Sequence, residues 1–180
     1  MRKTLGYHLV KTGYGLWLPG DERGSWSSAW DAQIGYYEPH MLHPGDPVRK
    51  RMAAERMKAA PVRFSETMMR VILEAIDRCA ANSRWRVGAC SLEPTHLHLQ
   101  VTYFDGDIHR MAKWLSAEMT KAVHHRTNHQ GPVWTKGKWC SYIFNERTWH
   151  GVRRYIEQHN ERRGLPPRPY SFIESPEVLR

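Results

Sequence analysis

The sequence predicts an α+β fold, on the strength of three observations. Short runs in which apolar and polar residues alternate are typical of strands with one buried face. Longer segments repeat apolar residues at helical spacing. The predicted order is strand, helix, strand, strand, helix, strand, helix, which matches the split βαβ arrangement of a ferredoxin-like antiparallel sheet. Two helices would cover one face of this sheet, and the C-terminal helix would be free to cover the other.

The first strand and the first long helix are predicted from different spacings. In the strand 3–12, two sets of side chains alternate, Leu5, Tyr7 and Leu9 against Gly6, His8 and Val10. The helix 65–82 begins at Ser65, a favoured N-cap residue. Its apolar stripe consists of Met68, Met69, Ile72, Leu73 and Ile76.

The second half of the chain repeats this pattern. A strand at 85–91 leads through Leu92-Glu93-Pro94 into a strand that begins near Glu93 and continues to about Tyr103, so an antiparallel pair is expected. Asp107 can cap a helix that runs to about Thr127. The last predicted elements are a strand at 139–145 and a helix at 148–160.

We expect a single domain over residues 1–180, with an insertion at about 19–61 and an extended, proline-rich tail at about 164–180. The insertion includes good helix formers and the cationic run that begins at Arg49. It would either contact a nucleic acid or form a solvated loop and helix on the surface. Both interpretations stay open.

The composition favours a polyanionic partner. The formal net charge is +9 and the isoelectric point is about 9.7, and clustered cations bind a phosphate backbone by releasing its counterions. The three cysteines form no Cys-x-x-Cys pair, and neither a signal peptide nor an apolar run of membrane-spanning length is apparent. A cytoplasmic location without membrane contact is therefore expected.

The strand that begins near Glu93 carries the clearest chemical signal. His96 and His98 occupy adjacent positions on one face, whereas Leu97 and Leu99 point to the other. Two imidazoles placed in this way can hold a divalent ion. An exposed polar strand face is the alternative interpretation.

The helix 148–160 presents a second set of reactive groups. Trp149, Val152 and Ile156 form its apolar stripe, and Tyr155 and His159 lie one turn apart at the edge of that stripe. If this helix crosses the polar face of the histidine strand, three imidazoles and a phenol would meet. Such a group suits nucleophilic attack on a phosphodiester.

These motifs resemble those of the HUH single-tyrosine transposases, which include the insertion-sequence type and the REP-associated tyrosine transposases. Thr95-His96-Leu97-His98-Leu99 matches the histidine–hydrophobe–histidine motif, and Arg154-Tyr155-Ile156 resembles the nucleophile helix. Relatives often carry Asn or Gln as the third ligand four residues after the tyrosine, where this chain has His159 between Gln158 and Asn160.

The resemblance implies an activity, a cofactor and a partner. Tyr155 would be the catalytic nucleophile that forms a 5′-phosphotyrosine and later rejoins the DNA. His96, His98 and His159 would bind a divalent metal, Mg²⁺ or Mn²⁺ by family resemblance, whereas three imidazoles also suit Zn²⁺. The expected partner is single-stranded DNA with hairpin structure, and a homodimer is compatible with the family.

Two alternatives remain open from the sequence. One is a non-catalytic, domesticated nucleic-acid-binding domain, and the other is a metal-dependent phosphodiester hydrolase that does not use Tyr155. Cationic residues that could contact DNA in any of these cases are Arg49, Lys50, Arg51, Lys136, Lys138, Arg153 and Arg154.

Overall fold

The structure, a computed structural model, describes residues 3–27, 41–135 and 139–174. Its elements are β1 Gly6–Thr12, β2 Ser25–Ser27, β3 Met41–His43, α1 Pro47–Glu55, α2 Glu66–Ala81, β4 Val87–Leu92, β5 His96–Thr102, α3 Ile108–Arg126, β6 Trp139–Ile143 and α4 Glu146–Arg162. The predicted α+β class is confirmed. In the described ranges, no helix is both long and apolar enough to cross a membrane.

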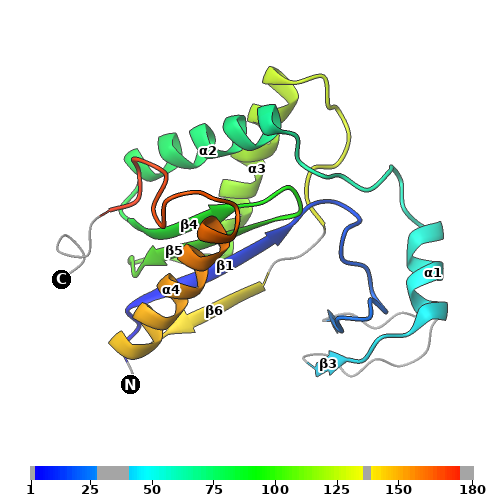
Figure 1. Ribbon diagram of the computed structural model, residues 1–180, viewed down its shortest axis with the longest axis horizontal. Helices are drawn as coiled ribbons and strands as arrows, with labels where there is room; N and C mark the ends of the chain where they lie inside the picture. Colours follow the sequence, from blue (N-terminus) through cyan, green and yellow to red (C-terminus); the bar gives the residue numbers. More distant parts are fainter. Residues whose placement is uncertain (1–2, 28–40, 136–138, 175–180) are drawn as a thin grey trace.

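The central sheet has the strand order β4-β5-β1-β6, and all its neighbouring strands are antiparallel (Figure 1). This is the predicted ferredoxin-like order. In the β1–β5 pair, Val10 lies opposite His98 and His8 lies opposite Gln100. Because opposite residues in a pair share a face, His8 and His98 are diagonal neighbours on one side of the sheet.

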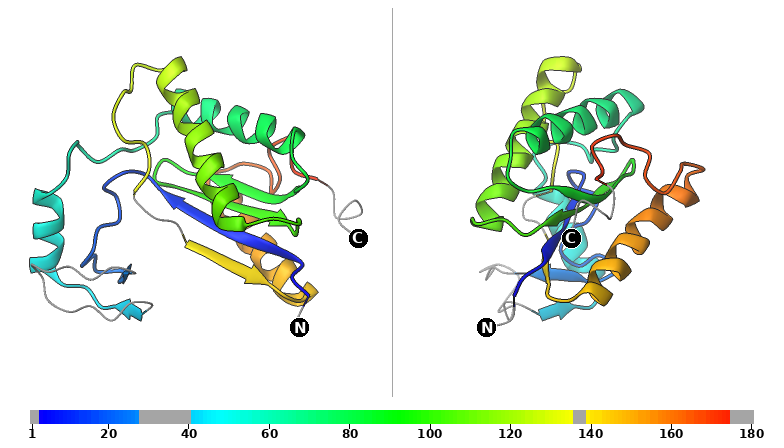
Figure 2. Two further views of the ribbon diagram at one scale, coloured as in Figure 1. Left: turned by 180° about the vertical axis from the view of Figure 1, so that it is seen from behind. Right: turned by 90° about the vertical axis from the view of Figure 1, so that its left-hand side faces the viewer.

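The sheet separates two layers of helices. α2 and α3 cover one face, and α4 crosses the other (Figure 2). The larger core lies under α2 and α3, where Leu9, Leu97, Leu99 and Val101 of the sheet are buried, as the predicted alternation requires. Ile72 and Ile76 of α2 and Leu115 and Met119 of α3 complete this layer.

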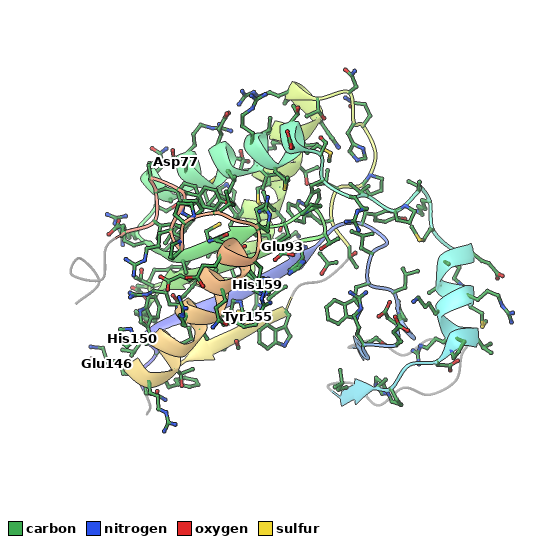
Figure 3. The ribbon with its side chains drawn as sticks, viewed as in Figure 1. Asp77, Glu93, Glu146, His150, Tyr155 and His159 are labelled. Atoms are coloured by element: carbon green, nitrogen blue, oxygen red, sulfur yellow. The ribbon has the colours of Figure 1, made fainter. Side chains whose placement is uncertain are left out.

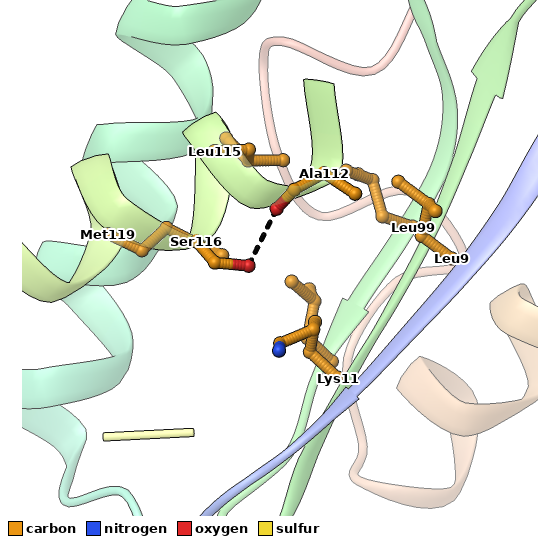
Figure 4. Close-up of a pocket in the computed structure, with 8 residues that line it drawn as sticks. Leu9, Lys11, Leu99, Ala112, Leu115, Ser116 and Met119 are labelled. Carbon is orange, nitrogen blue, oxygen red and sulfur yellow. Dashed lines mark hydrogen bonds between the residues drawn. The ribbon is translucent and has the colours of Figure 1, made fainter. Parts of the chain in front are cut away.

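A small cavity of about 10 Å³ lies between α3 and this face of the sheet (Figure 4). Leu9, Leu99, Leu115 and Met119 line it, together with Lys11 and Ser116. The space is about that of one water molecule. The cavity also lies on the face of the sheet opposite to the histidines, so it is packing space rather than a ligand site.

Helix termini follow local capping chemistry. Ser65 accepts a hydrogen bond from the backbone N–H of Met68, and Asp107 accepts from those of His109 and Arg110, so both predicted N-caps are confirmed. α4 begins at Glu146, two residues earlier than predicted, because Asn145 caps it by accepting from Thr148.

Other boundaries also differ from the prediction. β1 begins at Gly6 instead of Lys3, and β5 ends at Thr102. Tyr103, at the predicted end of this strand, therefore falls outside it and is 51% exposed. Side chains alternate between the two faces of the sheet only where the backbone is hydrogen-bonded as a strand.

The predicted insertion contains the short β2–β3 pair and α1, which Figure 1 shows set apart from the central sheet. Asp46 caps α1, and Pro47 occupies its first turn, where a missing N–H has no cost. The described part of the tail turns back onto the domain, with Tyr170, Phe172 and Ile173 packed against the core.

Candidate functional site

α4 is held on the sheet by a close contact at its N-terminal half. The ring of the buried Trp149 lies over Gly6 and Gly88, and a Cβ at Gly88 would come 2.6 Å from its Cζ2 atom. Gln100 Nε2, from the histidine face of β5, donates a hydrogen bond of 2.8 Å to the carbonyl oxygen of Trp149. Two glycines thus make the room that lets the helix approach the sheet.

The C-terminal half of α4 is anchored separately. The fully buried Asn160 donates from Nδ2 to the carbonyl oxygens of Cys90 and Pro167, each at 3.0 Å. Arg168 Nε donates to Glu157 Oε1 at 2.8 Å, which joins the tail to the helix. The segment that carries Tyr155 and His159 is therefore fixed at both ends.

The docked helix brings three imidazoles together. The ligand-capable atoms of His96, His98 and His159 all lie within 4.8 Å of one another. The ring centroids are 4.7 Å apart for His96–His98, 4.7 Å for His98–His159 and 5.6 Å for His96–His159. Two imidazoles from β5 and one from α4 thus form a cluster that could hold a metal ion.

Each of the three rings uses its Nδ1 atom in a hydrogen bond outside the cluster. His96 Nδ1 lies 2.8 Å from Thr95 Oγ1, His98 Nδ1 lies 3.1 Å from His8 Nε2, and His159 Nδ1 lies 2.5 Å from Glu93 Oε1. The Glu93 carboxylate accepts from His159 Nδ1, which leaves Nε2 of that ring for a metal, whereas the contacts of His96 and His98 can be made with the proton on either partner.

The Nε2 atom of His159 is the most informative of these atoms. It is buried and has no hydrogen-bond partner among the described residues. A buried polar nitrogen without a partner costs free energy unless a ligand satisfies it. The donor set and this orphaned nitrogen both fit a divalent cation.

The electrostatics favour the metal-binding form of the rings. Burial lowers the pKa of His98 to about 2 and that of His8 to about 4, and it also lowers the pKa of His96. The pKa values of His98 and His8 include a smaller lowering by neighbouring imidazoles. His8, His96 and His98 are therefore neutral at pH 7, and neutral imidazole is the form that ligates metals.

Tyr155 lies beside this cluster and remains accessible. Its ring centroid is 4.8 Å from that of His159 and 5.3 Å from that of His98, and the residue is 44% exposed. Tyr155, His159 and Glu93 lie near one another along the C-terminal half of α4 (Figure 3). A phosphate at the cluster would thus be within reach of the phenol.

The cations predicted from the insertion have different surroundings. Arg49 is only 3% exposed, so the prediction that it contacts DNA is corrected: its side chain is packed beside Gly20 at the start of α1. Lys50 pairs with Asp21 at 3.2 Å and is half-exposed, and Arg51 is exposed. Position on a cationic helix alone could not distinguish these three residues.

The cations predicted elsewhere also fall into separate groups. Arg153 is largely buried, with its Nε atom 3.5 Å from Glu157 Oε1, and burial lowers its pKa. Arg154 is exposed and pairs with Glu161 at 2.9 Å. Lys136 and Lys138 lie outside the described residues.

Sequence reasoning missed Glu93 as a partner of the cluster. The residue precedes β5, so strand alternation assigns it no face. The sequence signal that could have identified Glu93 is its position, three residues before His96.

Comparisons with known proteins give distant matches. No protein-family model matches the chain, and no curated protein matches it. A solved structure of a REP-associated tyrosine transposase bound to a REP hairpin is 15% identical, with a TM-score of 0.49, over 96% of this chain and 78% of that one. A candidate transposase from Deinococcus radiodurans R1 is 13% identical, with a TM-score of 0.40, over 87% of this chain and 92% of that one.

Proposed function

We propose that this protein is a metal-dependent enzyme that cuts and rejoins single-stranded DNA through Tyr155. One observation carries the proposal: the ring centroid of Tyr155 lies 5.3 Å from that of His98 and 4.8 Å from that of His159. These two histidines belong to the imidazole triad that β5 and α4 form together. The motifs that resemble HUH single-tyrosine transposases are the same residues that meet in this cluster.

The chemistry begins with attack of the Tyr155 oxygen on phosphorus. The phenol loses its proton, the tyrosine O–P bond forms, and the bond from phosphorus to the 3′ oxygen breaks. The leaving 3′ oxygen gains a proton and becomes a free hydroxyl, and the DNA 5′ end stays on the enzyme as a phosphotyrosine. A 3′-hydroxyl can later attack this phosphodiester and release Tyr155, so rejoining needs no external energy source.

The imidazole triad would support this step by holding a divalent ion. When bound, the ion supplies positive charge to a non-bridging oxygen of the scissile phosphate and helps to align it. Glu93, His8 and Thr95 hold the three rings in place through Nδ1. Three imidazoles suit Zn²⁺ or Mn²⁺, and the family resemblance suggests Mg²⁺ or Mn²⁺.

The net charge of +9 supports a nucleic acid as the substrate. Single-stranded DNA is the proposed form because a phosphate in an unpaired strand can enter a site in which a helix lies against a sheet. Hairpins next to the cut would be recognised by other surfaces of the chain.

The test is a cleavage assay with end-labelled hairpin oligonucleotides, analysed on a denaturing gel in the presence of Mn²⁺. The expected result is a slow-migrating protein–DNA band that is lost in Tyr155→Phe. Tyr142→Phe is the matched control, because Tyr142 is an exposed tyrosine on β6 whose pairing with Tyr7 places it on the opposite face of the sheet.

Other outcomes would identify the alternative functions. Cleavage that survives Tyr155→Phe, with no covalent band, would indicate a metal-dependent hydrolase that activates water. Binding without cleavage under any metal would indicate a domesticated DNA-binding domain.

A further inference from the structure

Trp139 lies on the same side of the sheet as the histidine cluster. It begins β6 and is paired with Val10 of β1, so the two side chains share a face, and His8 lies on that face as well. The indole is 5.4 Å from the ring of His8, at an interplanar angle of 88°. His8 is in turn 6.3 Å from the ring of Tyr155.

The side chain is exposed although its backbone is held in place. Trp139 is 50% exposed, and β6 is the outer strand of the sheet. A tryptophan in the core, such as Trp134 or Trp149, is at least nine-tenths buried in this protein. Trp139 therefore presents an aromatic surface to solvent beside the proposed reaction centre.

We propose that Trp139 is a stacking platform for an unpaired base next to the phosphate that Tyr155 attacks. The inference rests on the proposed function and adds a positioning residue to it. Unpaired bases stack on exposed aromatic side chains regardless of sequence, because every base has a π face. A base held on Trp139 would restrict the strand and keep the neighbouring phosphate at the cluster.

Residues on the other face of the sheet provide a contrast. Trp114 on α3 is exposed to a similar extent, 42%, but α3 covers the face opposite to the histidines. Solvent exposure of an indole alone would give both tryptophans the same role. Of these two exposed tryptophans, Trp139 is the one with a ring contact on the histidine face, to His8, whose Nε2 atom lies 3.1 Å from His98 Nδ1.

The test compares two fluorescent probes, a 12-nucleotide oligodeoxythymidylate and a 12-mer of abasic sugar phosphates, in binding to the full chain by anisotropy. Stacking predicts that Trp139→Ala weakens binding of the thymidylate about 5- to 100-fold and that of the abasic strand less than about twofold. Trp139→Phe should keep most of the affinity, and Trp114→Ala should change neither probe. Thermal unfolding of each variant checks that the fold is intact.

Equal weakening of both probes by Trp139→Ala, or no weakening of either, would overturn the inference. So would a wild-type protein that does not distinguish the thymidylate from the abasic strand. These results are separate from the fate of the proposed function, which fails when no Tyr155 adduct forms. If the Tyr155 adduct forms but Trp139→Ala does not selectively weaken binding of the thymidylate, only the role of Trp139 is rejected.

Discussion

Glu93 and His159 are 66 positions apart in the sequence, and Glu93 Oε1 accepts a hydrogen bond from His159 Nδ1 at 2.5 Å. The other carboxylate oxygen lies 3.8 Å from His96 Nδ1. One carboxylate thus connects the imidazole of His159 on α4 to that of His96 on β5. A carboxylate behind an imidazole orients the ring and raises its basicity as a metal ligand.

Glu93→Gln is predicted to weaken metal binding about 10- to 100-fold, because the amide orients His159 less strongly and cannot supply the negative charge. Isothermal titration calorimetry with Mn²⁺ and Zn²⁺ measures the effect. Glu118→Gln is the control, since Glu118 pairs with Lys121 on α3, away from the cluster. Unchanged affinity in Glu93→Gln would show that the carboxylate does not support the metal.

His159→Ala is predicted to reduce metal affinity by more than about 100-fold, because it removes a ligand rather than a partner of a ligand. His150→Ala on the same helix is the matched control, since His150 is exposed and outside the cluster. Comparable affinity in the two variants, measured by competition with a metal-binding dye, would remove His159 from the ligand set.

Much of the fold was predictable because strand and helix periodicities are local properties of the sequence. The alternation at Leu97, His98 and Leu99 gave both faces of β5 correctly. Exact boundaries were not predictable, since the early start of α4 depends on the cap made by Asn145.

The site was only partly predictable. His96 and His98 share a strand face and Tyr155 and His159 share a helix edge, so each pair could be found from spacing.

The contact between these two pairs depends on the small size of Gly6 and Gly88 under Trp149, which the spacing of apolar residues does not indicate. Glu93 contacts His159 and Trp139 contacts His8 through tertiary structure, and strand or helix spacing assigned neither residue a function.

Stability of the metal-free protein is predicted to fall with pH below about 6.5. The pKa values of His8 and His98 are lowered in the folded state, to about 4 and about 2, so the unfolded chain binds protons first. Each histidine then costs about 1.4 kcal/mol per pH unit from about pH 6.5 down to its folded-state pKa.

Thermal unfolding in EDTA between pH 7.5 and 5 measures this loss of stability. His8→Gln should make the fall in stability shallower, with His96 and His98 still contributing, and exposed His125→Gln should leave it unchanged. A wild-type melting temperature that stays flat over this range would contradict the assignment of buried, neutral rings.

Gly88→Ala is predicted to destabilise the fold by about 1–3 kcal/mol, because its Cβ would meet the buried ring of Trp149 at 2.6 Å. The displaced helix should also bind metal more weakly. Gly151→Ala on α4 is the opposite case: nothing lies within 4 Å, and a helical alanine should stabilise by about 0.5–1 kcal/mol. Urea unfolding measures the free energy of unfolding of both variants. If Gly88→Ala is as stable as Gly151→Ala, α4 is not tightly docked against Gly88.

The central claim is that Tyr155 becomes joined to DNA at the imidazole cluster. The most direct measurement is mass spectrometry of tryptic peptides after incubation with Mn²⁺ and hairpin oligonucleotides. We expect a nucleotide-modified peptide that contains Tyr155, present with Mn²⁺ and absent with EDTA or in His98→Ala. DNA attached to any other residue, or cleaved strands with every peptide unmodified, would contradict it.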